Sequence, residues 1–383
     1  MLFDALEPLN PNLFQPEQFD KHQLGSFIHQ FQLNDLQKAD IALIGLQEER
    51  TGVETGKAQA PDVIRKALYQ LFAPHEHLRV VDLGNIETGE TIEDSLKNMQ
   101  SVVSELLEMK ILPVVFGGSQ GMVFGQYLGY QKLEQFINLG VINKSFTFRE
   151  LQDTSVINDS TYLYKIAADK PNYLFNMVQF GYQTYLTNPE MIKLMKRLNF
   201  DEMRLGRIRD DIKETEPLIR DLDALCVSIQ SVRHADAPGQ ISNSPNGLNA
   251  EELAQMMYYA GMSDKLSSIG FYDYNPLYDG HGMTAQLVAQ LIWCFIDGFY
   301  QRKHDWPKHD SEQFYKYTIN QEHEDHPLTF LKSRATSRWW FEMPIERAQI
   351  KQQYFIPCSF ADYEMALEGE IPDRWIHAYN KLS

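Results

Sequence analysis

The stretch VVFGGSQGMVFG, residues 114–125, guides the interpretation of the whole chain. A β-branched apolar run ends in two glycines, two small polar residues follow, and a helix is predicted to begin after them. In an open α/β sheet, ligands bind outside the carboxyl end of such a strand. Ser119 and Gln120, however, provide no usual metal ligand, strong base or nucleophile. The stretch therefore combines the backbone of an active site with unexpected side chains.

Short apolar runs that alternate with amphipathic stretches indicate an α/β domain over residues 40–303. The predicted strands are 41–47, 78–84, 111–118, 135–140, 173–181, 203–208, 224–230 and 266–274. Between two of them, Thr91 and Asp94 form a capping-box signature at the start of a predicted helix. Strands that alternate with helices pair in parallel and are covered on both faces. We therefore expect a three-layer α/β/α domain with an eight-stranded, mostly parallel sheet.

The two ends of the chain differ from this pattern. Residues 1–39 are polar and contain prolines, and we expect them to form an N-terminal arm. Residues 304–383 lose the alternation and hold four of the five tryptophans, so we expect a C-terminal extension that packs on the core. These tryptophans are Trp306, Trp339, Trp340 and Trp375.

The composition favours a globular cytoplasmic protein. The formal net charge of −17 disfavours nucleic-acid binding, because an acidic surface repels phosphate backbones. No apolar run is long enough to span a membrane, and the acidic start does not resemble a signal peptide. Three widely spaced cysteines predict a reducing compartment without a disulfide framework.

The order of motifs between residues 40 and 300 resembles the ureohydrolase superfamily, which includes arginase and agmatinase and whose most similar member is formimidoylglutamase. The segment TGVETGKAQAPDVIRKALYQL is similar to that family's early glycine-rich loop and following helix. The remaining signatures correspond to residues 114–125, 136–145, 224–239 and 271–292. The resemblance implies hydrolysis of a guanidinium or amidine carbon by two Mn²⁺ ions that share an activated water.

The resemblance also implies where the metal ligands should lie. The family's Gly-Gly-Asp-His-Ser corresponds to residues 117–121, and its Asp-Ala-His-x-Asp corresponds to 140–144. The two aspartates of its later motif correspond to Ser228 and Gln230, and Asp273 falls where the family has a substrate-binding glutamate. The family's positions therefore fall on Ser119, Gln120, Gly140, Ile142, Lys144, Ser228, Gln230 and Asp273. We expect these residues to form a degenerate pocket with no metal and no cofactor.

Two further expectations concern charged groups near this pocket. We expect Lys144 to approach Asp273, since the ammonium replaces a carboxylate at a matching strand end. A different register would use Asp221 and Asp223 as ligands, but these residues precede the apolar run and would lie at the opposite edge of the sheet.

Several functions are consistent with these residues. The strand ends could complete a packed core, retain a small-molecule pocket without catalysis, or support catalysis without metal. The leading prediction is a non-catalytic relative of formimidoylglutamase that acts as a binding, scaffold or regulatory protein with an unidentified protein partner. The alternative is an active C–N hydrolase for a formimino or guanidino substrate that uses a displaced or different metal site. The resemblance also permits a homo-oligomer.

The C-terminal extension contains Arg–Trp pairs with two interpretations. Because arginine stacks on indole rings, the pairs could join the extension to the core. Because both residue types are frequent at binding hot spots, they could instead form a partner surface. The residues are Arg338, Trp339, Trp340, Arg374 and Trp375. Elsewhere, Cys226 is expected to be a buried inert thiol, 322–326 a solvated loop, and Asp279 and His281 part of a glycine-rich loop.

Overall fold

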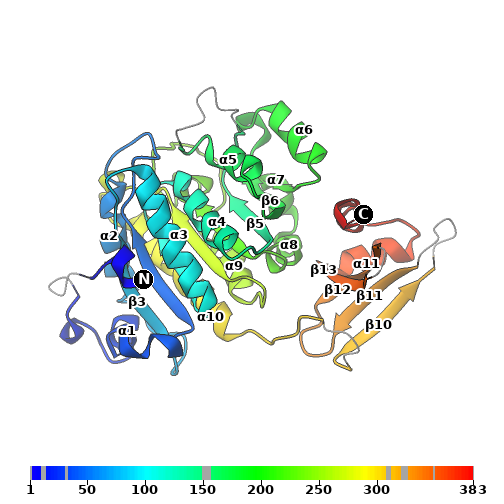
Figure 1. The fold of residues 1–383 in the computed structure, drawn as a ribbon, viewed down its shortest axis with the longest axis horizontal. Helices are drawn as coiled ribbons and strands as arrows, with labels where there is room; N and C mark the ends of the chain where they lie inside the picture. Colours follow the sequence, from blue (N-terminus) through cyan, green and yellow to red (C-terminus); the bar gives the residue numbers. More distant parts are fainter. Residues whose placement is uncertain are drawn as a thin grey trace.

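A computed structural model describes residues 2–9, 14–30, 33–148, 157–307, 312–320, 327–347 and 350–382. A large sheet flanked by helices forms the core, and a smaller sheet with two helices forms the C-terminal part (Figure 1). Within the described residues, no helix is long and apolar enough to cross a membrane.

The described chain forms a nine-stranded core sheet in which neighbouring strands pair in parallel, except for the first. In spatial order the strands are β1 (Leu6–Glu7), β3 (Val80–Ile86), β2 (Ile41–Leu46), β4 (Leu112–Phe116), β9 (Ser268–Tyr272), β8 (Ala224–Ser228), β5 (Ile137–Ile142), β6 (Leu174–Tyr182) and β7 (Asp201–Arg204). The expected α/β class is confirmed. The ninth strand is β1, which the sequence did not suggest and which pairs antiparallel with β3.

Helices cover both faces of this sheet. They are α1 (Leu24–Gln30), α2 (Ala60–Leu68), α3 (Ile92–Glu108), α4 (Val123–Lys132), α5 (Tyr162–Ala168), α6 (Pro189–Arg197), α7 (Leu205–Asp210), α8 (Thr215–Arg220), α9 (Ala250–Gly261) and α10 (Met283–Tyr300). In β2, Ile41 and Leu43 belong to the hydrophobic cluster that includes residues of α2, α9 and α10, whereas Ala42 and Ile44 belong to the cluster that includes residues of α3 and α4. Both faces of the strand are therefore buried, as its unbroken apolar sequence predicts.

One predicted strand differs from the structure. The run 203–208 was expected to be a strand, but β7 ends at Arg204 and the chain continues as α7. Leu205 and Ile208 are both buried, and their spacing places them on one face of a helix. In contrast, the capping box at Thr91 is confirmed, because the Thr91 side chain accepts the Asp94 N–H and the Asp94 side chain returns to the Thr91 N–H.

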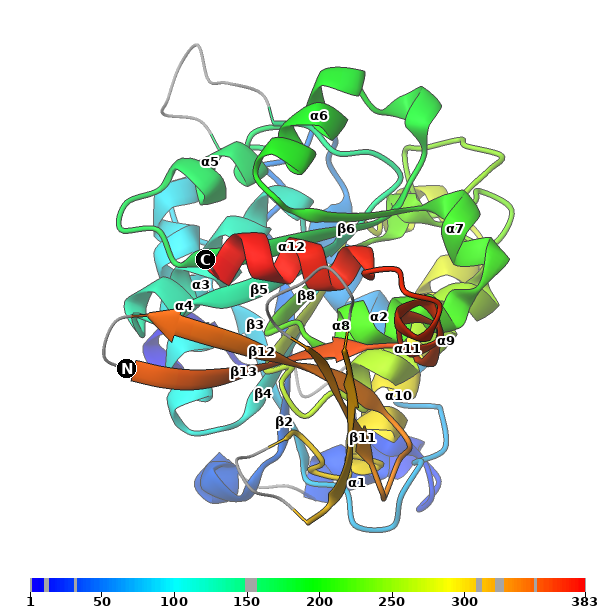
Figure 2. The same cartoon turned by 90° about the vertical axis from the view of Figure 1, so that its right-hand side faces the viewer.

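The C-terminal part is an antiparallel sheet packed against helices. It contains β10 (Phe314–Ile319), β11 (Leu328–Ser333), β12 (Trp339–Arg347) and β13 (Ile350–Cys358), followed by α11 (Phe360–Leu367) and α12 (Asp373–Leu382). Helix α12 returns to the core and lies near β6 (Figure 2), where Lys381 contacts Asn176 and Asp201. This contact joins the end of the described chain to the edge of the large sheet.

Candidate functional site

The turn after β4 brings Ser119 and Gln120 to the carboxyl edge of the sheet. Gly117 and Gly118 have φ angles of 101° and 65°, a region that favours glycine. A Cβ on Gly117 would also lie 2.6 Å from the carbonyl oxygen of Leu46. The two glycines therefore permit the turn, as the sequence predicted.

Asp273 follows β9 directly and is the centre of a hydrogen-bond network. Its Oδ1 accepts from Lys57 Nζ at 2.9 Å and from the backbone N–H of Gln120 at 3.2 Å. Its Oδ2 accepts from Ser228 Oγ at 2.6 Å. Asp273 has φ 69°, and its own N–H donates to the Gly118 carbonyl. Three strand ends, those of β4, β8 and β9, are thus joined through one buried carboxylate.

The ammonium of Lys57 lies among three carboxylates at this edge. The Lys57 side chain is 1% exposed, and Nζ lies 2.9 Å from Asp273, 3.6 Å from Glu54 Oε1 and 3.9 Å from Asp159 Oδ2. Nζ also donates to Ser119 Oγ at 3.3 Å. We refer to Lys57, Glu54, Asp159, Asp273 and Ser119 as the Lys57 cluster.

Backbone contacts hold the Lys57 cluster in place. Glu49 Oε2 accepts the N–H groups of Gly56 and Ala58, on either side of Lys57, at 2.8 and 2.9 Å. Gly56 has φ 107°, so the chain turns sharply before Lys57. Asp159 is fixed separately, because its Oδ1 accepts the Gly121 N–H at 2.7 Å. The position of the ammonium therefore depends on loops that lie far apart in the sequence.

The Lys57 cluster holds more negative than positive charge. Burial alone would lower the pKa of Lys57, but the charges of Asp273 and Asp159 outweigh burial and raise it. Burial, together with the charge of Asp273, raises the pKa of Asp159 to about 7. Glu54 Oε1 is buried and makes no hydrogen bond. Three carboxylates that share one ammonium carry excess negative charge, and this excess favours binding of a further cation or a proton.

The structure brings together only some of the residues predicted to form the pocket. Ser119, Ser228 and Asp273 belong to one network, and Gln120 accepts a hydrogen bond from Asn143 Nδ2 at 2.6 Å. The backbone N–H of Gln230 donates to Ser228 Oγ at 3.3 Å.

Two of the predicted pocket residues lie in the apolar core. Gly140 and Ile142 are inside β5, where Gly140 packs against Leu222 and Leu225. The strand continues to Ile142, so its first polar end residue is Asn143. The transfer of the family motif to 140–144 therefore placed one position, Gly140, inside the strand and another, Ile142, on its last, apolar residue.

Lys144 lies near enough to Asp273 to feel its charge, but the two side chains form no direct ion pair. Lys144 Nζ donates to Ser242, while Lys57 takes the place at Asp273. The pKa of Lys144 is lowered because burial outweighs the nearby charge of Asp273. The ammonium groups of Lys57 and Lys144 both lie near Asp273, but Lys57, from the loop before α2, is the one that pairs with it.

Sequence reasoning missed Lys57, Glu54 and Asp159. Lys57 and Glu54 lie in the segment 51–71, which was assigned only as a glycine-rich loop and helix. The only sequence signal for the buried position of Lys57 was its place directly after a glycine and before an apolar helix. A solvated lysine gives the same pattern. Asp159 had no such signal, because its position follows a long connection after β5.

The other charged candidates have structural partners. Asp221 and Asp223 precede β8 and pair with Lys265 at 2.9 and 3.5 Å, at the amino edge of the sheet. Asp279 accepts the Tyr274 hydroxyl and the Ala285 N–H at the start of α10. Burial raises the pKa of the Cys226 thiol, as expected for an inert cysteine. Residues 322–326 lie outside the described part of the chain.

The Arg–Trp pairs of the extension form contacts within the chain. Trp339, Trp340 and Trp375 are buried. The Arg220 guanidinium of α8 lies 4.3 Å from the Trp340 ring centroid and donates to the Trp339 carbonyl. The two arginines of the pairs also bind core carboxylates: Arg338 pairs with Glu216 at 3.3 Å, and Arg374 pairs with Glu214 at 2.7 Å.

Comparison with known proteins identifies relatives of the core. The model of the arginase family matches residues 39–297. The formimidoylglutamase of Staphylococcus haemolyticus is 25% identical over 293 residues, which cover 73% of this chain and 94% of that protein. The formimidoylglutamase of Clostridium tetani is 23% identical over 259 residues, covering 63% of this chain and 77% of that protein.

Solved structures show the same fold. A crystal structure of Trypanosoma cruzi formiminoglutamase with Mn²⁺ has a TM-score of 0.67 and 19% identity, covering 73% of this chain and 99% of that one. The formimidoylglutamase of Bacillus subtilis has a TM-score of 0.63 and 20% identity, covering 69% of this chain and 88% of that one.

These relatives correct the expectation that no cofactor is used. That expectation is wrong, because a formiminoglutamase of this fold contains Mn²⁺ and exchanged residues at the transferred positions do not establish loss of the metal. The inference considered only strand-end positions and overlooked the carboxylates of Glu54 and Asp159. Within the described residues, no three His, Cys, Asp or Glu side chains form a metal-binding group as folded. The carboxylates of the Lys57 cluster surround an ammonium instead.

Proposed function

The chain belongs to the arginase family, and from this membership we propose that it is a hydrolase of the formimidoylglutamase type. Its substrates would be linear amidines or guanidines, which carry a positive charge on the group to be cleaved. The observation that carries the proposal is the convergence of three carboxylates on one buried cation at the carboxyl ends of the strands. Relatives named formimidoylglutamase align over most of the chain, which supports this choice of substrate.

The carboxylates of the Lys57 cluster are of the chemical type that binds divalent cations, but in the described part of the chain they surround the Lys57 ammonium and form no metal-binding group as folded. Carboxylate oxygens are the ligands that hard divalent ions prefer, and Glu54 Oε1 is a buried acceptor without a hydrogen bond. Glu54, Asp159 and Asp273 would hold the ion, and Lys57 would have to leave the point where they converge. A bound Mn²⁺ would supply Lewis acidity that activates water for attack on the amidine carbon.

The chain's own residues would position the reacting groups. Asp273 would accept hydrogen bonds from a cationic amidine or guanidine, and Ser228 and the Gln120 N–H fix that carboxylate. The glycine turn at 117–118 keeps this edge rigid, since the Asp273 N–H donates to Gly118. Rigid placement of the carboxylate is what electrostatic stabilisation of a cationic reacting group requires.

The test is a hydrolysis assay with a control from the opposite edge of the sheet. The purified chain is incubated with Mn²⁺ and formimidoylglutamate or arginine, and release of glutamate or urea is measured. We expect turnover, and we expect Asp273→Asn to reduce kcat/KM by about 100-fold or more. Asp221→Asn, which changes a carboxylate at the amino edge, should retain wild-type kcat/KM. Absence of hydrolysis of both compounds, with and without Mn²⁺, would contradict the proposal.

One observation favours a second candidate, a non-catalytic binding or regulatory protein. The Lys57 ammonium already lies at the point where the carboxylates converge. On this proposal the ammonium stands where a metal ion would have to bind, and the site would bind its ligand without cleaving it. Calorimetric binding of formimidoylglutamate without release of glutamate would favour this candidate over the hydrolase, whereas binding followed by turnover would reject it.

A further inference from the structure

We propose that Lys144 and Ser242 form a carboxylate-binding subsite at the carboxyl edge of the core sheet, near Asp273. The subsite would favour acids, so among amidines and guanidines it would select those that also carry a carboxylate. The inference rests on the proposed function only for the choice of amidines as ligands. It concerns binding, so absence of hydrolysis would not overturn it.

The first argument is that the fold provides no counterion for the Lys144 ammonium. Among the described residues, no carboxylate forms an ion pair with its Nζ, and its hydrogen bond goes to the hydroxyl of Ser242. The nearby charge is that of Asp273, whose oxygens already accept from Lys57 and Ser228. Burial outweighs this charge and lowers the pKa of Lys144. An anion in direct contact would therefore stabilise an ammonium that is partly buried and unpaired.

The second argument is the presence of unused donors. An ammonium has three N–H donors, and that of Lys144 donates to Ser242 Oγ. Ser242 is buried, and its own O–H has no acceptor in the part of the chain that the structure describes. An ammonium and a hydroxyl thus lie next to each other with hydrogens available for one anion. Hydrogen bonds from an ammonium to a carboxylate are stronger than those between neutral groups.

The third argument is that the backbone on both sides of the subsite is held in place. Lys144 follows β5, and its carbonyl accepts the Gln183 N–H at 2.8 Å, which joins it to the segment after β6. The loop that carries Ser242 is folded around the buried Gln240 side chain, whose Nε2 donates to the Ala237 carbonyl at 2.7 Å. A site that is already ordered loses little conformational freedom when a ligand binds.

The charge of the subsite indicates which class of anion it fits. One ammonium beside a neutral hydroxyl balances a single negative charge, as on a carboxylate, and not the nearly double charge of a phosphate group. Lys144 is partly exposed, so a ligand can reach its ammonium from solvent. Glutamate, the acid that hydrolysis of formimidoylglutamate would release, is therefore the probe for the experiment.

The experiment measures acylation of lysines in the wild-type chain by an amine reagent, with peptides quantified by mass spectrometry. Glutamate at about ten times its dissociation constant should lower labelling of Lys144 by about tenfold, because a bound carboxylate covers the ammonium. Lys265, which pairs with Asp221 at the opposite edge of the sheet, is the control and should be labelled equally with and without glutamate. Agmatine, which carries a guanidinium but no carboxylate, should leave labelling of Lys144 unchanged.

Calorimetric titration with glutamate gives the dissociation constant and a second test. Lys144→Met removes the charge and keeps a long side chain, and it should weaken glutamate binding about tenfold or more. Lys144→Arg keeps the charge and should bind more tightly than Lys144→Met. Lys265→Met is the matched control, and its affinity should equal that of the wild type.

Four results would overturn the proposal: no binding of glutamate to the wild type, equal affinity of the wild type and Lys144→Met, labelling of Lys144 that glutamate does not change, or equal protection by agmatine. The labelling experiment uses only wild-type protein, so it does not depend on the folding of a variant. Hydrolysis of formimidoylglutamate with the same kcat/KM in Lys144→Met as in the wild type would overturn this inference alone. Glutamate binding that requires Lys144, without any hydrolysis, would overturn only the proposed hydrolase.

Discussion

Two lysine–carboxylate clusters lie at opposite edges of the core sheet, and they differ in how their charges are satisfied. At the amino edge, Lys265 pairs with Asp221 and Asp223, and its side chain is 26% exposed. Asn138 donates to both carboxylates there, through its side chain and its backbone N–H. At the carboxyl edge, Lys57 is buried among three carboxylates, and Glu54 Oε1 has no hydrogen bond.

The contrast between the two edges shows how a structural ion cluster can be distinguished from a candidate site. The Asp-x-Asp pattern of Asp221 and Asp223 looks like a metal motif in the sequence, but its oxygens are used by Asn138, at the start of β5, and by Lys265, which precedes β9. The Lys57 cluster has no such local pattern, yet it places three carboxylates around one ammonium, and the buried Glu54 Oε1 makes an ion pair but no hydrogen bond. Unsatisfied groups in a buried site are the stronger indication of ligand binding.

Neutralising either lysine should lower the stability of the fold, and the loss should be greater for Lys57. Lys57→Met leaves buried carboxylates without their cation and should lower the free energy of unfolding by about 3–5 kcal/mol in the absence of metal. Lys265→Met should lower it by only about 1–3 kcal/mol, because water reaches that cluster. Urea denaturation of both variants measures the difference. Equal losses would remove the distinction between the two edges.

A double variant tests whether Lys57 and Asp273 stabilise each other. Adding Asp273→Asn to Lys57→Met removes one uncompensated charge, so part of the lost stability should return. We expect a coupling energy of about 1–3 kcal/mol between the two positions in a double-mutant cycle. Additive effects of the two substitutions would show that Asp273 and Lys57 do not interact energetically.

A smaller effect is expected from the turn that positions Lys57. Glu49→Gln keeps the size of the side chain but weakens its bonds to the N–H groups of Gly56 and Ala58. We expect a loss of about 1–2 kcal/mol in unfolding free energy. Acylation of Lys57 by an amine reagent, measured by mass spectrometry of its peptide, should also increase, since the turn holds the ammonium inside the cluster. If Lys57 is acylated to the same extent in Glu49→Gln as in the wild type, the turn does not restrain it.

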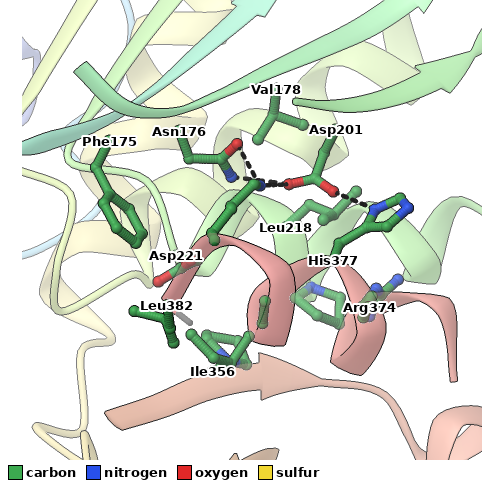
Figure 3. A pocket seen from close by; sticks show the side chains of 14 residues that line it. Phe175, Asn176, Val178, Asp201, Leu218, Asp221, Ile356, Arg374, His377 and Leu382 are labelled. Atoms are coloured by element: carbon green, nitrogen blue, oxygen red, sulfur yellow. Dashed lines mark hydrogen bonds and ion pairs between the residues drawn. The ribbon is translucent and has the colours of Figure 1, made fainter. Parts of the chain in front are cut away.

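The smallest effect concerns a third, partly exposed ion cluster, where α12 meets the core (Figure 3). Burial would raise the pKa of Asp201, but the hydrogen bond with His377 and the charge of Lys381 lower it to about 2. The hydrogen bond to Asp201 raises the pKa of His377 above its ordinary value.

The sign of the pH dependence follows from these directions. The His377 contribution is complete below the ordinary histidine pKa of about 6.5 and is lost as the pH rises through the raised value. The Asp201 contribution is lost only as the pH falls toward 2. The urea midpoint of the wild type should therefore exceed that of His377→Asn at pH values of about 5.5, and this difference should shrink at about 8.5. A difference independent of pH would exclude His377 as its source.

Local patterns in the sequence were sufficient to predict most strands and turns of the core. Apolar runs and the spacing of helices predicted seven of the nine strands of the large sheet, because burial of both sheet faces requires such runs, whereas the predicted strand 203–208 is mostly helix α7. The capping box at Thr91 and the glycine turn at 117–118 are equally local, since each depends on residues within a few positions of one another. The short strand β1 was missed because two residues carry no periodic pattern.

The candidate site was predictable only in part, because it depends on contacts between distant segments. Ser119, Ser228 and Asp273 could be inferred, since parallel strands end at the same edge. Lys57 and Asp159 could not, because their loops reach the site through the way the chain packs, and the sequence around them also suits solvated residues. The sequence thus specifies strands, turns and the edge where chemistry is possible. Which ammonium meets which carboxylate there is decided by tertiary packing, since charges interact through distance in space and not through spacing along the chain.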